Sequence, residues 1–171
     1  MTLQLLPLHR GLVIDTGPLL IHAFSTFRGG RFLPDVAADI PGQDLQGVAD
    51  SLGRVLKSAR RVVITPEVLV EFQALSQVRA GLDRDATMEL LTFYSPVLTA
   101  IEEWYMPKDR LLKFKGDTNS WSLCFTDSSL VLTARELSLP ILTQDRELRN
   151  RSENLRVRTL HLYYDLYLGV V

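Results

Sequence analysis

The chain has 171 residues, of which 46% are hydrophobic and 23% are charged. This composition is ordinary for a globular protein, and the length favours one domain with a single core over two small ones. No apolar run in the sequence reaches the roughly 18 residues that a membrane span requires, and we expect no signal peptide and no membrane partner. The net charge of -1 argues against a surface that grips nucleic acid by charge alone. The lone cysteine, Cys124, cannot form an internal disulfide, which favours a cytoplasmic protein with Cys124 as a small core residue.

In chain order, the first predicted element is a short buried strand at residues 11–15, which ends in the carboxylate of Asp15. Thr16-Gly17-Pro18 breaks this strand, and Pro18 can open a helix. Residues 25–44 hold several glycines and prolines, and we expect them to form a loop or lid. A helix with one apolar face is predicted for residues 45–59.

The remaining elements continue this alternation of strand and helix. A β-branched strand is predicted at 61–65, and Thr65-Pro66 then begins a helix that runs to about residue 79. The pattern further predicts a helix at 85–94, a strand or helix at 97–101, a loop at 113–122, helices at 126–138 and 145–150, and strands at 141–143 and 157–162. This order predicts an α/β fold with three layers, α/β/α, and a central parallel sheet. We expect residues 1–171 to form one domain, with an insertion at 25–44.

Two acidic residues fall on predicted helix faces that are otherwise apolar. At 100° per residue, Glu71 lies on the same arc as Val68, Phe72, Leu75 and Val78, whereas Glu67 lies outside it in the first turn, where an acid complements the helix dipole. Asp127 projects on the apolar side of the helix at 126–138. A carboxylate that faces a core is costly unless a cation or hydrogen bonds compensate it. Alone, Asp127 is explained as well by the dipole of its helix.

Two further acids follow predicted strands. Asp15 ends the first strand, and Asp145 comes two residues after the strand at 141–143. Ligands of open α/β sheets gather beyond the carboxyl ends of the strands, although either acid could also be a turn residue or a helix cap. Four acids at one edge would repel one another, and a hard divalent cation, Mg²⁺ or Mn²⁺, would compensate that charge. We therefore predict one divalent-metal site formed by Asp15, Glu71, Asp127 and Asp145.

Other catalytic patterns are weak in this sequence. The three histidines lack metal-ligand spacing, which argues against zinc. The glycines at 29 and 30 do not form a phosphate-binding loop. Tyr163, Tyr164 and Tyr167 are expected in the core or at a dimer contact rather than in a base-stacking platform.

Several segments together resemble a known family. Residues 12–20 (LVIDTGPLL), 64–72 (ITPEVLVEF), 126–134 (TDSSLVLTA) and 141–148 (ILTQDREL) look like the PIN-domain nucleases, which include the VapC-type toxins. The resemblance covers nearly the whole chain in the correct order. The stretches at 25–44 and about 95–125 are longer than in compact members of that family, which leaves toxin identity and substrate choice open.

The resemblance implies a metal-dependent endoribonuclease. It assigns Asp15, Glu71, Asp127 and Asp145 to an acidic quartet that is both catalytic and metal-binding, with Mg²⁺ or Mn²⁺ hydrolysing RNA phosphodiester bonds. Thr16 and Thr143 match hydroxyl positions beside the acids and could orient ligands. Arg146 and Arg149 are first candidates to hold flanking phosphates. The expected partners are RNA, a second copy of the chain in a homodimer and, if the protein is a toxin, an antitoxin protein.

Two other interpretations remain. One is a PIN-like module that binds RNA or protein without catalysis, although no acid of the quartet is missing. The other is a phosphohydrolase of the haloacid dehalogenase type, because Val13-Ile14-Asp15-Thr16 resembles the start of its nucleophile motif. That family requires a second aspartate two residues after the first, and Gly17 occupies this position.

Overall fold

The strands form one five-stranded parallel sheet in the order β3-β2-β1-β4-β5. The computed structural model describes residues 10–40, 44–116 and 122–167. Its strands are β1 (Leu12–Ile14), β2 (Val62–Ile64), β3 (Glu102–Glu103), β4 (Ile141–Thr143) and β5 (Thr159–His161). All neighbouring strands pair in parallel, and Val13 faces both Val63 in β2 and Ile141 in β4. The α/β prediction with a central parallel sheet is confirmed.

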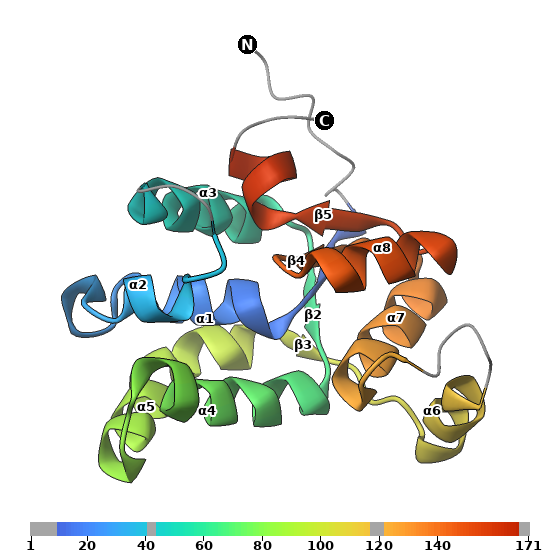
Figure 1. Cartoon of the computed structure of the whole chain (residues 1–171), viewed down its shortest axis with the longest axis horizontal. Helices are drawn as coiled ribbons and strands as arrows, with labels where there is room; N and C mark the ends of the chain where they lie inside the picture. The colour runs from blue at the N-terminus through green and yellow to red at the C-terminus, as the bar shows by residue number, and fades with distance from the viewer. Residues whose placement is uncertain (1–9, 41–43, 117–121, 168–171) are drawn as a thin grey trace.

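Helices flank the sheet on both sides (Figure 1). They are α1 (Thr16–Phe24), α2 (Leu33–Val36), α3 (Leu45–Ser58), α4 (Pro66–Ala80), α5 (Arg84–Ala100), α6 (Lys108–Lys115), α7 (Phe125–Leu137) and α8 (Arg146–Asn154). In Figure 1, α2 to α5 lie to the left of the strands, and α6 to α8 lie to the right. No helix in the described ranges is both long enough and apolar enough to cross a membrane.

The central strands are buried because helices cover both faces. All three residues of the central strands β1 and β4 are buried, as are those of the edge strand β5, and the residues of β1 are fully inaccessible to solvent. Strands of an all-parallel sheet are buried on both faces and therefore consist of continuous β-branched and aliphatic residues. For this reason Leu-Val-Ile in β1 and Ile-Leu-Thr in β4 could be predicted as strands. The edge strand β3 consists of two exposed glutamates, and their charge protects an open edge from pairing with other chains.

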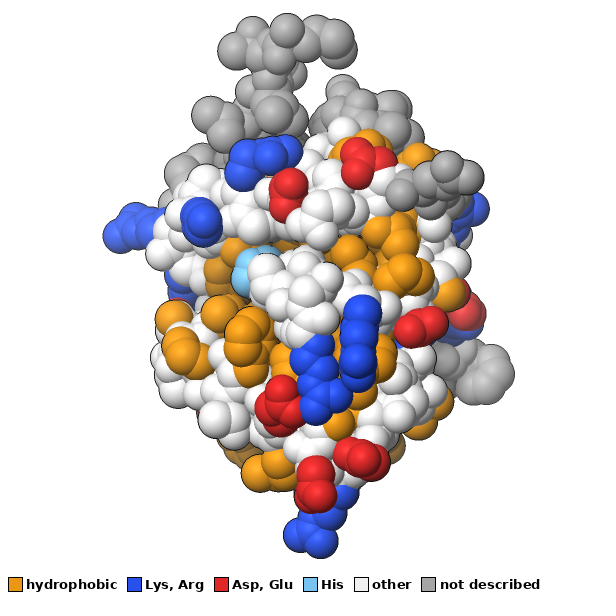
Figure 2. All heavy atoms as spheres, turned by 90° about the vertical axis from the view of Figure 1, so that its left-hand side faces the viewer, with side chains coloured by type: hydrophobic (Ala, Val, Ile, Leu, Met, Phe, Trp, Pro, Cys, Tyr) orange, Lys and Arg blue, Asp and Glu red, His pale blue; other side chains and the backbone are white. Residues whose placement is uncertain are grey.

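The segment predicted as a loop or lid is more ordered than expected. It contains a 3-10 turn, η2 (Phe27–Gly30), and the short helix α2, although residues 41–43 lie outside the described part. Phe27, Leu33 and Val36 are buried and join the main core, which fixes this insertion against α1 and α4. Figure 2 views the molecule from the side where α2 lies, and shows hydrophobic, basic and acidic side chains interspersed over that face.

Three other boundaries differ from the sequence prediction. Residues 97–101 were open between strand and helix; α5 extends to Ala100, with Pro96 inside it. Lys113 to Lys115 belong to α6 rather than to a loop, and residues 117–121 of that predicted loop lie outside the described ranges. The last strand is followed by a π-helix, η3 (Leu162–Tyr167), in which Tyr163 stacks on Tyr167. These tyrosines are half-buried and pack against the core.

Candidate functional site

The acids singled out from the sequence lie together in one cleft at the carboxyl edge of the sheet. This cleft has a volume of about 340 Å³. It is lined by Asp15, Thr16, Gly17, Asp39, Glu71, Leu75, Arg79, Asp127, Gln144, Asp145 and Arg146. Parallel strands bring their carboxyl ends to one edge, and β1 and β4 are neighbours, so Asp15 and Asp145 meet there although 130 positions separate them along the chain.

Asp15 is the most deeply buried acid of the cleft, with 8% of its surface exposed. One carboxylate oxygen accepts a hydrogen bond from the backbone N–H of Thr16, and the other accepts one from the hydroxyl of Thr143, each at 2.6 Å. Burial raises the pKa of Asp15 to about 7, against those two hydrogen bonds, and the negative charges of Asp127 and Glu71 raise it further. The cleft therefore holds more negative charge than its own donors compensate.

Glu71 reaches the cleft from α4 and is half-buried. Its Oε2 accepts a 2.6 Å hydrogen bond from the hydroxyl of Thr16, which ties α4 to the start of α1. The predicted apolar arc of α4 was partly wrong, because Val78 is 78% exposed. The buried positions of α4 are Val68, Phe72, Ser76 and Ala80, so the helix packs through a row with a spacing of four residues. Glu71 borders that row.

Glu67 was assigned from sequence to the dipole of α4 alone. The structure adds that its Oε2 is buried without a hydrogen-bond partner among the described residues. Glu67 also lines a shallow pocket that shares Glu71 with the main cleft. It therefore adds negative charge beside the site, although it does not line the cleft itself.

Asp127 lies in the first turn of α7 and is half-buried. Burial raises its pKa, as do the charges of Asp145 and Glu71, whereas hydrogen bonds from the thiol and backbone of Cys124 lower it. In return, the N–H of Asp127 donates to Cys124 Sγ at 3.2 Å. Cys124 is thus the exposed N-cap of α7, and the expectation of a core cysteine was wrong. Asp127 therefore combines a capping role with a place in the cleft.

Asp145 is exposed and forms the N-cap of α8. Its Oδ1 accepts from the N–H groups of Glu147 and Leu148, at 2.6 and 3.2 Å. Its own N–H donates to the hydroxyl of Thr143 at 2.9 Å. Because that same hydroxyl donates to Asp15, Thr143 links the acids at the ends of β1 and β4. The structure thus places both predicted hydroxyl residues, Thr16 and Thr143, in direct contact with acids of the cleft.

The donor set of the cleft suits a hard cation, because its acidic side chains offer carboxylate oxygens. Within the described ranges, however, no three acidic, histidine or cysteine side chains are arranged so that one ion could contact all of them. The four acids share a cleft but not one coordination shell. Mg²⁺ is commonly held by only one or two carboxylates and keeps several waters. The raised pKa values of Asp15 and Asp127 show which carboxyl groups would gain most from a nearby cation.

Three polar side chains that line the cleft were not predicted from the sequence. Arg79 in α4 pairs with Asp39 in the insertion, with 3.0 Å between Nη1 and Oδ2, which brings a cation and another acid to the rim. Gln144 lies against Gly17, where a Cβ atom would come within 2.7 Å of the glutamine side chain. The absence of a side chain at Gly17 thus leaves room for Gln144. This explains why glycine occupies the position at which a dehalogenase-type enzyme needs an aspartate. No periodicity could have found Asp39, because its position depends on how the insertion packs.

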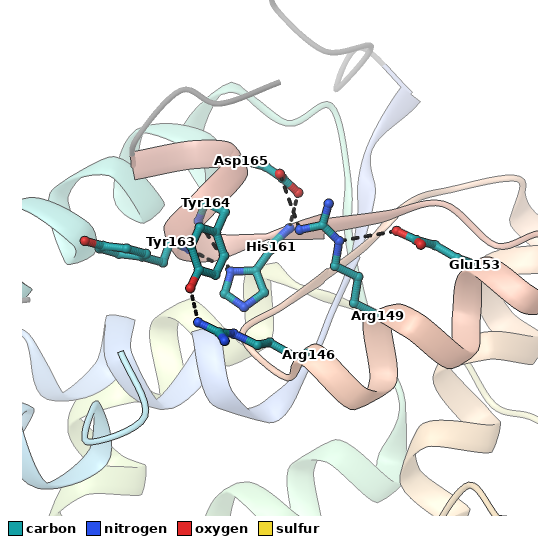
Figure 3. A network of polar contacts seen from close by, with 7 residues as sticks. All are labelled: Arg146, Arg149, Glu153, His161, Tyr163, Tyr164 and Asp165. Carbon is teal, nitrogen blue, oxygen red and sulfur yellow. Dashed lines mark hydrogen bonds and ion pairs between the residues drawn. The ribbon is translucent and has the colours of Figure 1, made fainter. Parts of the chain in front are cut away.

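The two arginines predicted to hold RNA lie differently (Figure 3). Arg146 lines the cleft and also contacts Tyr164, with its guanidinium 4.9 Å from the ring centre and hydrogen-bonded to the phenol oxygen. Arg149 does not line the cleft. It pairs with Glu153 at 3.3 Å and with Asp165 at 3.6 Å, and it borders a separate pocket with Arg146 and Tyr164.

A buried histidine supports the Arg146 side of this network. His161 is 3% exposed, and burial lowers its pKa. Its Nδ1 accepts from the backbone N–H groups of Tyr163 and Tyr164, at 3.3 and 3.4 Å. Its ring lies 4.8 Å from that of Tyr164, measured between ring centres. A neutral histidine therefore holds the tyrosine against which Arg146 rests.

Comparisons with known proteins assign no family to the chain. No protein-family model matches the sequence, and no curated protein matches it. The structure establishes an α/β protein with a five-stranded parallel sheet in the order 3-2-1-4-5.

Proposed function

We propose that the protein is a cytoplasmic, divalent-metal-dependent endoribonuclease with a PIN-like domain that spans residues 1–171. The observation that carries this proposal is the meeting of Asp15, Glu71, Asp127 and Asp145 in one cleft. Burial and mutual charge raise the pKa of Asp15 there to about 7. Such an excess of negative charge is costly to a folded protein unless a cation accompanies it. A homodimer and an antitoxin protein stay predictions of the motif resemblance.

The cleft acids would hold Mg²⁺ or Mn²⁺ in pairs, with water completing the coordination. When bound, the cation supplies positive charge against the charge that develops on the phosphate during hydrolysis. Thr16 and Thr143 fix the acids for this role, because each hydroxyl donates to a carboxylate oxygen and limits its rotation. The geometry of the site is therefore set by hydrogen bonds that exist before a ligand arrives.

Glu71 is suited to orient the attacking water. Thr16 occupies its Oε2, and no hydrogen bond within the described residues occupies its Oε1. In the proposed reaction, the water oxygen forms a bond to phosphorus and the bond from phosphorus to the leaving ribose oxygen breaks. A carboxylate takes the proton of the water, and the leaving oxygen gains a proton from solvent.

Arg79 and Arg146 would orient the RNA strand. Both line the cleft beside the acids, so their guanidinium groups can pair with phosphates that flank the scissile one. Arg79 would exchange its exposed ion pair with Asp39 for a phosphate, at small cost, since surface pairs contribute little. Arg149 is committed to Glu153 and Asp165 and is a weaker candidate than the sequence suggested.

The test is cleavage of an internally labelled, single-stranded RNA by the full chain with Mn²⁺ or Mg²⁺. We expect cleavage by the wild type, none with chelator, and a loss of about a thousandfold or more in Asp15→Asn, because the change removes a charge from the cation site. Asp85→Asn is the matched control, since Asp85 is exposed in the first turn of α5, outside the cleft. Circular dichroism verifies the fold of each variant.

Three outcomes would overturn the proposal. Full activity in Asp15→Asn would show that the cleft does not carry the reaction. Release of phosphate from a small monoester without RNA cleavage would favour an aspartyl-phosphate mechanism. RNA binding without cleavage under any divalent cation would support the non-catalytic interpretation.

A further inference from the structure

A second cavity lies at the opposite edge of the sheet. It has a volume of about 630 Å³, compared with about 340 Å³ for the acidic cleft. Its lining consists of Arg10, Ala134, Arg135, Ser138, Leu139, Pro140, Arg156, Val157 and Arg158. Arg10 precedes β1, Pro140 precedes β4 and Arg158 precedes β5. These three strands are parallel, so the cavity sits at their amino ends, away from the acids at their carboxyl ends.

Among the residues that the structure describes, four arginines and no acidic residue line this arginine pocket. Arg10, Arg135, Arg156 and Arg158 form no ion pair and no side-chain hydrogen bond with any residue of the described ranges. The whole chain carries 19 basic and 20 acidic residues, so a cavity with four cations and no anion departs from the average surface. All four arginines are exposed to solvent, which weakens the repulsion between their like charges, and an anion bound between them would reduce it further.

Nearby acids are engaged with other arginines. Glu136, next to Arg135, pairs with Arg110 at 2.9 Å, and Glu153, three residues before Arg156, pairs with Arg149 at 3.3 Å. The helices α7 and α8 end at this pocket, and each helix end contributes about half a negative charge. Two such ends offset roughly one of the four guanidinium charges, so the pocket keeps a clear positive excess.

The backbone at the pocket is also unusual. Ser138 and Arg156 have φ angles of +54° and +58°, and only one other non-glycine residue of the described ranges, Arg28, has a positive φ. A left-handed conformation is unfavourable for arginine, which has a Cβ atom. Glycine would terminate α8 at lower cost, and here an arginine directs its side chain to the pocket instead.

From these observations, we propose that the arginine pocket is a binding site for phosphate groups. Guanidinium groups bind phosphate oxygens in pairs of hydrogen bonds, and four of them from three segments of the chain can surround a ligand with several phosphates. Leu139, Pro140 and Val157 provide an apolar wall beside the charges, and the cavity volume falls within the range of sites for small organic ligands. The phosphates belong either to a free polyphosphorylated small molecule or to an RNA strand, which present the same chemistry.

The first arm of the test measures binding of inorganic tripolyphosphate by calorimetry, in chelator and at low salt. The full chain is used, and the chelator removes divalent cations, so the result does not depend on the proposed nuclease activity. We expect Arg156→Gly and Arg158→Ala each to weaken binding about tenfold, and the double variant about a hundredfold, because each removes a charge-assisted contact. Arg156→Gly keeps the fold testable, since glycine favours the positive φ at this position.

Arg84→Ala is the matched control, because Arg84 is an exposed arginine in α5 with no ion pair to any residue that the structure describes, and it lines neither this pocket nor the cleft. Its affinity for tripolyphosphate should stay within about twofold of the wild type. An equal loss in all three single variants would show diffuse attraction to surface charge and would overturn the site. Wild-type affinity in the double variant would overturn it as well.

The second arm identifies the source of the phosphate with a single-stranded RNA that lacks terminal phosphates. If the strand occupies the pocket, Arg156→Gly weakens RNA binding and tripolyphosphate competes with the RNA. If a free ligand occupies it, RNA affinity is unchanged while tripolyphosphate binding falls. Both results support a phosphate site. If Arg156→Gly binds both RNA and tripolyphosphate as tightly as the wild type, the proposal is contradicted.

Discussion

The two edges of the sheet carry opposite charge. At the carboxyl edge, acids from β1, α4, α7 and the start of α8 surround a cleft, and two arginines lie at its rim. At the amino edge, four arginines line a larger cavity, and no acid of the described part of the chain lines it. The net charge of -1 does not reveal this separation, because the negative charges at one edge and the positive charges at the other nearly cancel in the net charge of the chain. The ligands that each edge can bind therefore depend on where the charges lie and not on their total.

The edges also differ in how well their charges are supported. Asp15 and Asp145 are held by backbone N–H groups and by Thr143, so the acidic cleft is organised without a ligand. The arginines of the opposite pocket have no such partners among the described residues. We expect the side chains of the acidic cleft to keep the same positions with and without a ligand. We expect the arginine side chains of the opposite pocket to become ordered when an anion binds.

The largest predicted difference between the two edges is that the acidic edge makes the free energy of unfolding depend on pH. The pKa of Asp15 is about 7 in the folded protein and about 3.9 in an unfolded chain, so between these values the folded state holds the extra proton. The free energy of unfolding should therefore fall as the pH rises from 4 to 7 in chelator, by up to roughly 4 kcal/mol at about 1.4 kcal/mol per pKa unit. Denaturant titrations across this range measure it.

Asp15→Asn should flatten that pH dependence, and Asp85→Asn should leave it as in the wild type. Unchanged pH dependence in Asp15→Asn would show that the negative charge of the cleft is already compensated within the protein. In that case the main argument for a cation would be lost.

A smaller change in stability distinguishes the effect of the negative charge of Asp145 from the effect of its hydrogen bonds to the start of α8. Asp145→Ala should lower stability in metal-free buffer by about 1 kcal/mol, because Oδ1 caps two N–H groups of α8. Asp145→Asn keeps a capping oxygen and removes a charge, so stability should be unchanged or higher; the same is expected of Asp127→Asn. Thermal unfolding compares the variants, and a large loss in both Asn variants would mean that these acids serve the fold alone.

At the basic edge, two glycine substitutions should change stability in opposite directions. Arg156→Gly should raise the free energy of unfolding by about 1 kcal/mol, since it relieves a positive φ. Arg158→Gly should lower it by about 0.5–1 kcal/mol, because Arg158 enters strand β5 and its carbonyl accepts from Ile141 N–H. Equal losses in urea titrations would contradict the left-handed assignment at Arg156.

The smallest predicted effect concerns the support of Arg146. Tyr164→Phe removes the hydroxyl that Arg146 contacts but keeps the ring beneath its guanidinium. We expect KM for RNA to rise about two- to fivefold with little change in kcat, because a single exposed polar contact contributes under about 1 kcal/mol. Steady-state cleavage assays would show this, and a fall in kcat alone would place Arg146 at the reacting phosphate instead.

Much of the acidic edge was predictable because its acids follow local rules. Asp15 comes directly after a buried strand and Asp145 two residues after another, and Glu71 and Asp127 share helix faces with apolar residues. The failures have equally local causes. Val78 matched the helical period but lies off the row of α4 residues that packs against the core, which continues past it to Ala80. Cys124 is a helix cap because it immediately precedes α7, which begins at Phe125.

The arginine pocket could not be predicted in this way. Its members stand at positions 10, 135, 156 and 158, and only the strand order, with β1, β4 and β5 adjacent, brings these segments together. Arg79 and Asp39 were missed for the same reason, because their contact requires the insertion to fold against α4. Local pattern identifies elements and their ends, whereas contacts between distant loops depend on topology.

The central claim is that the acidic cleft binds a divalent cation, and a crystal of the full chain soaked in Mn²⁺ tests it most directly. We predict an anomalous peak between the carboxylates of the cleft, with oxygen ligands at about 2.1–2.2 Å drawn from pairs of acids and from water. The same soak of Asp15→Asn should lose or weaken that peak. A cleft without manganese at saturating concentration, or with its acids paired to Arg79 and Arg146 instead, would contradict the account.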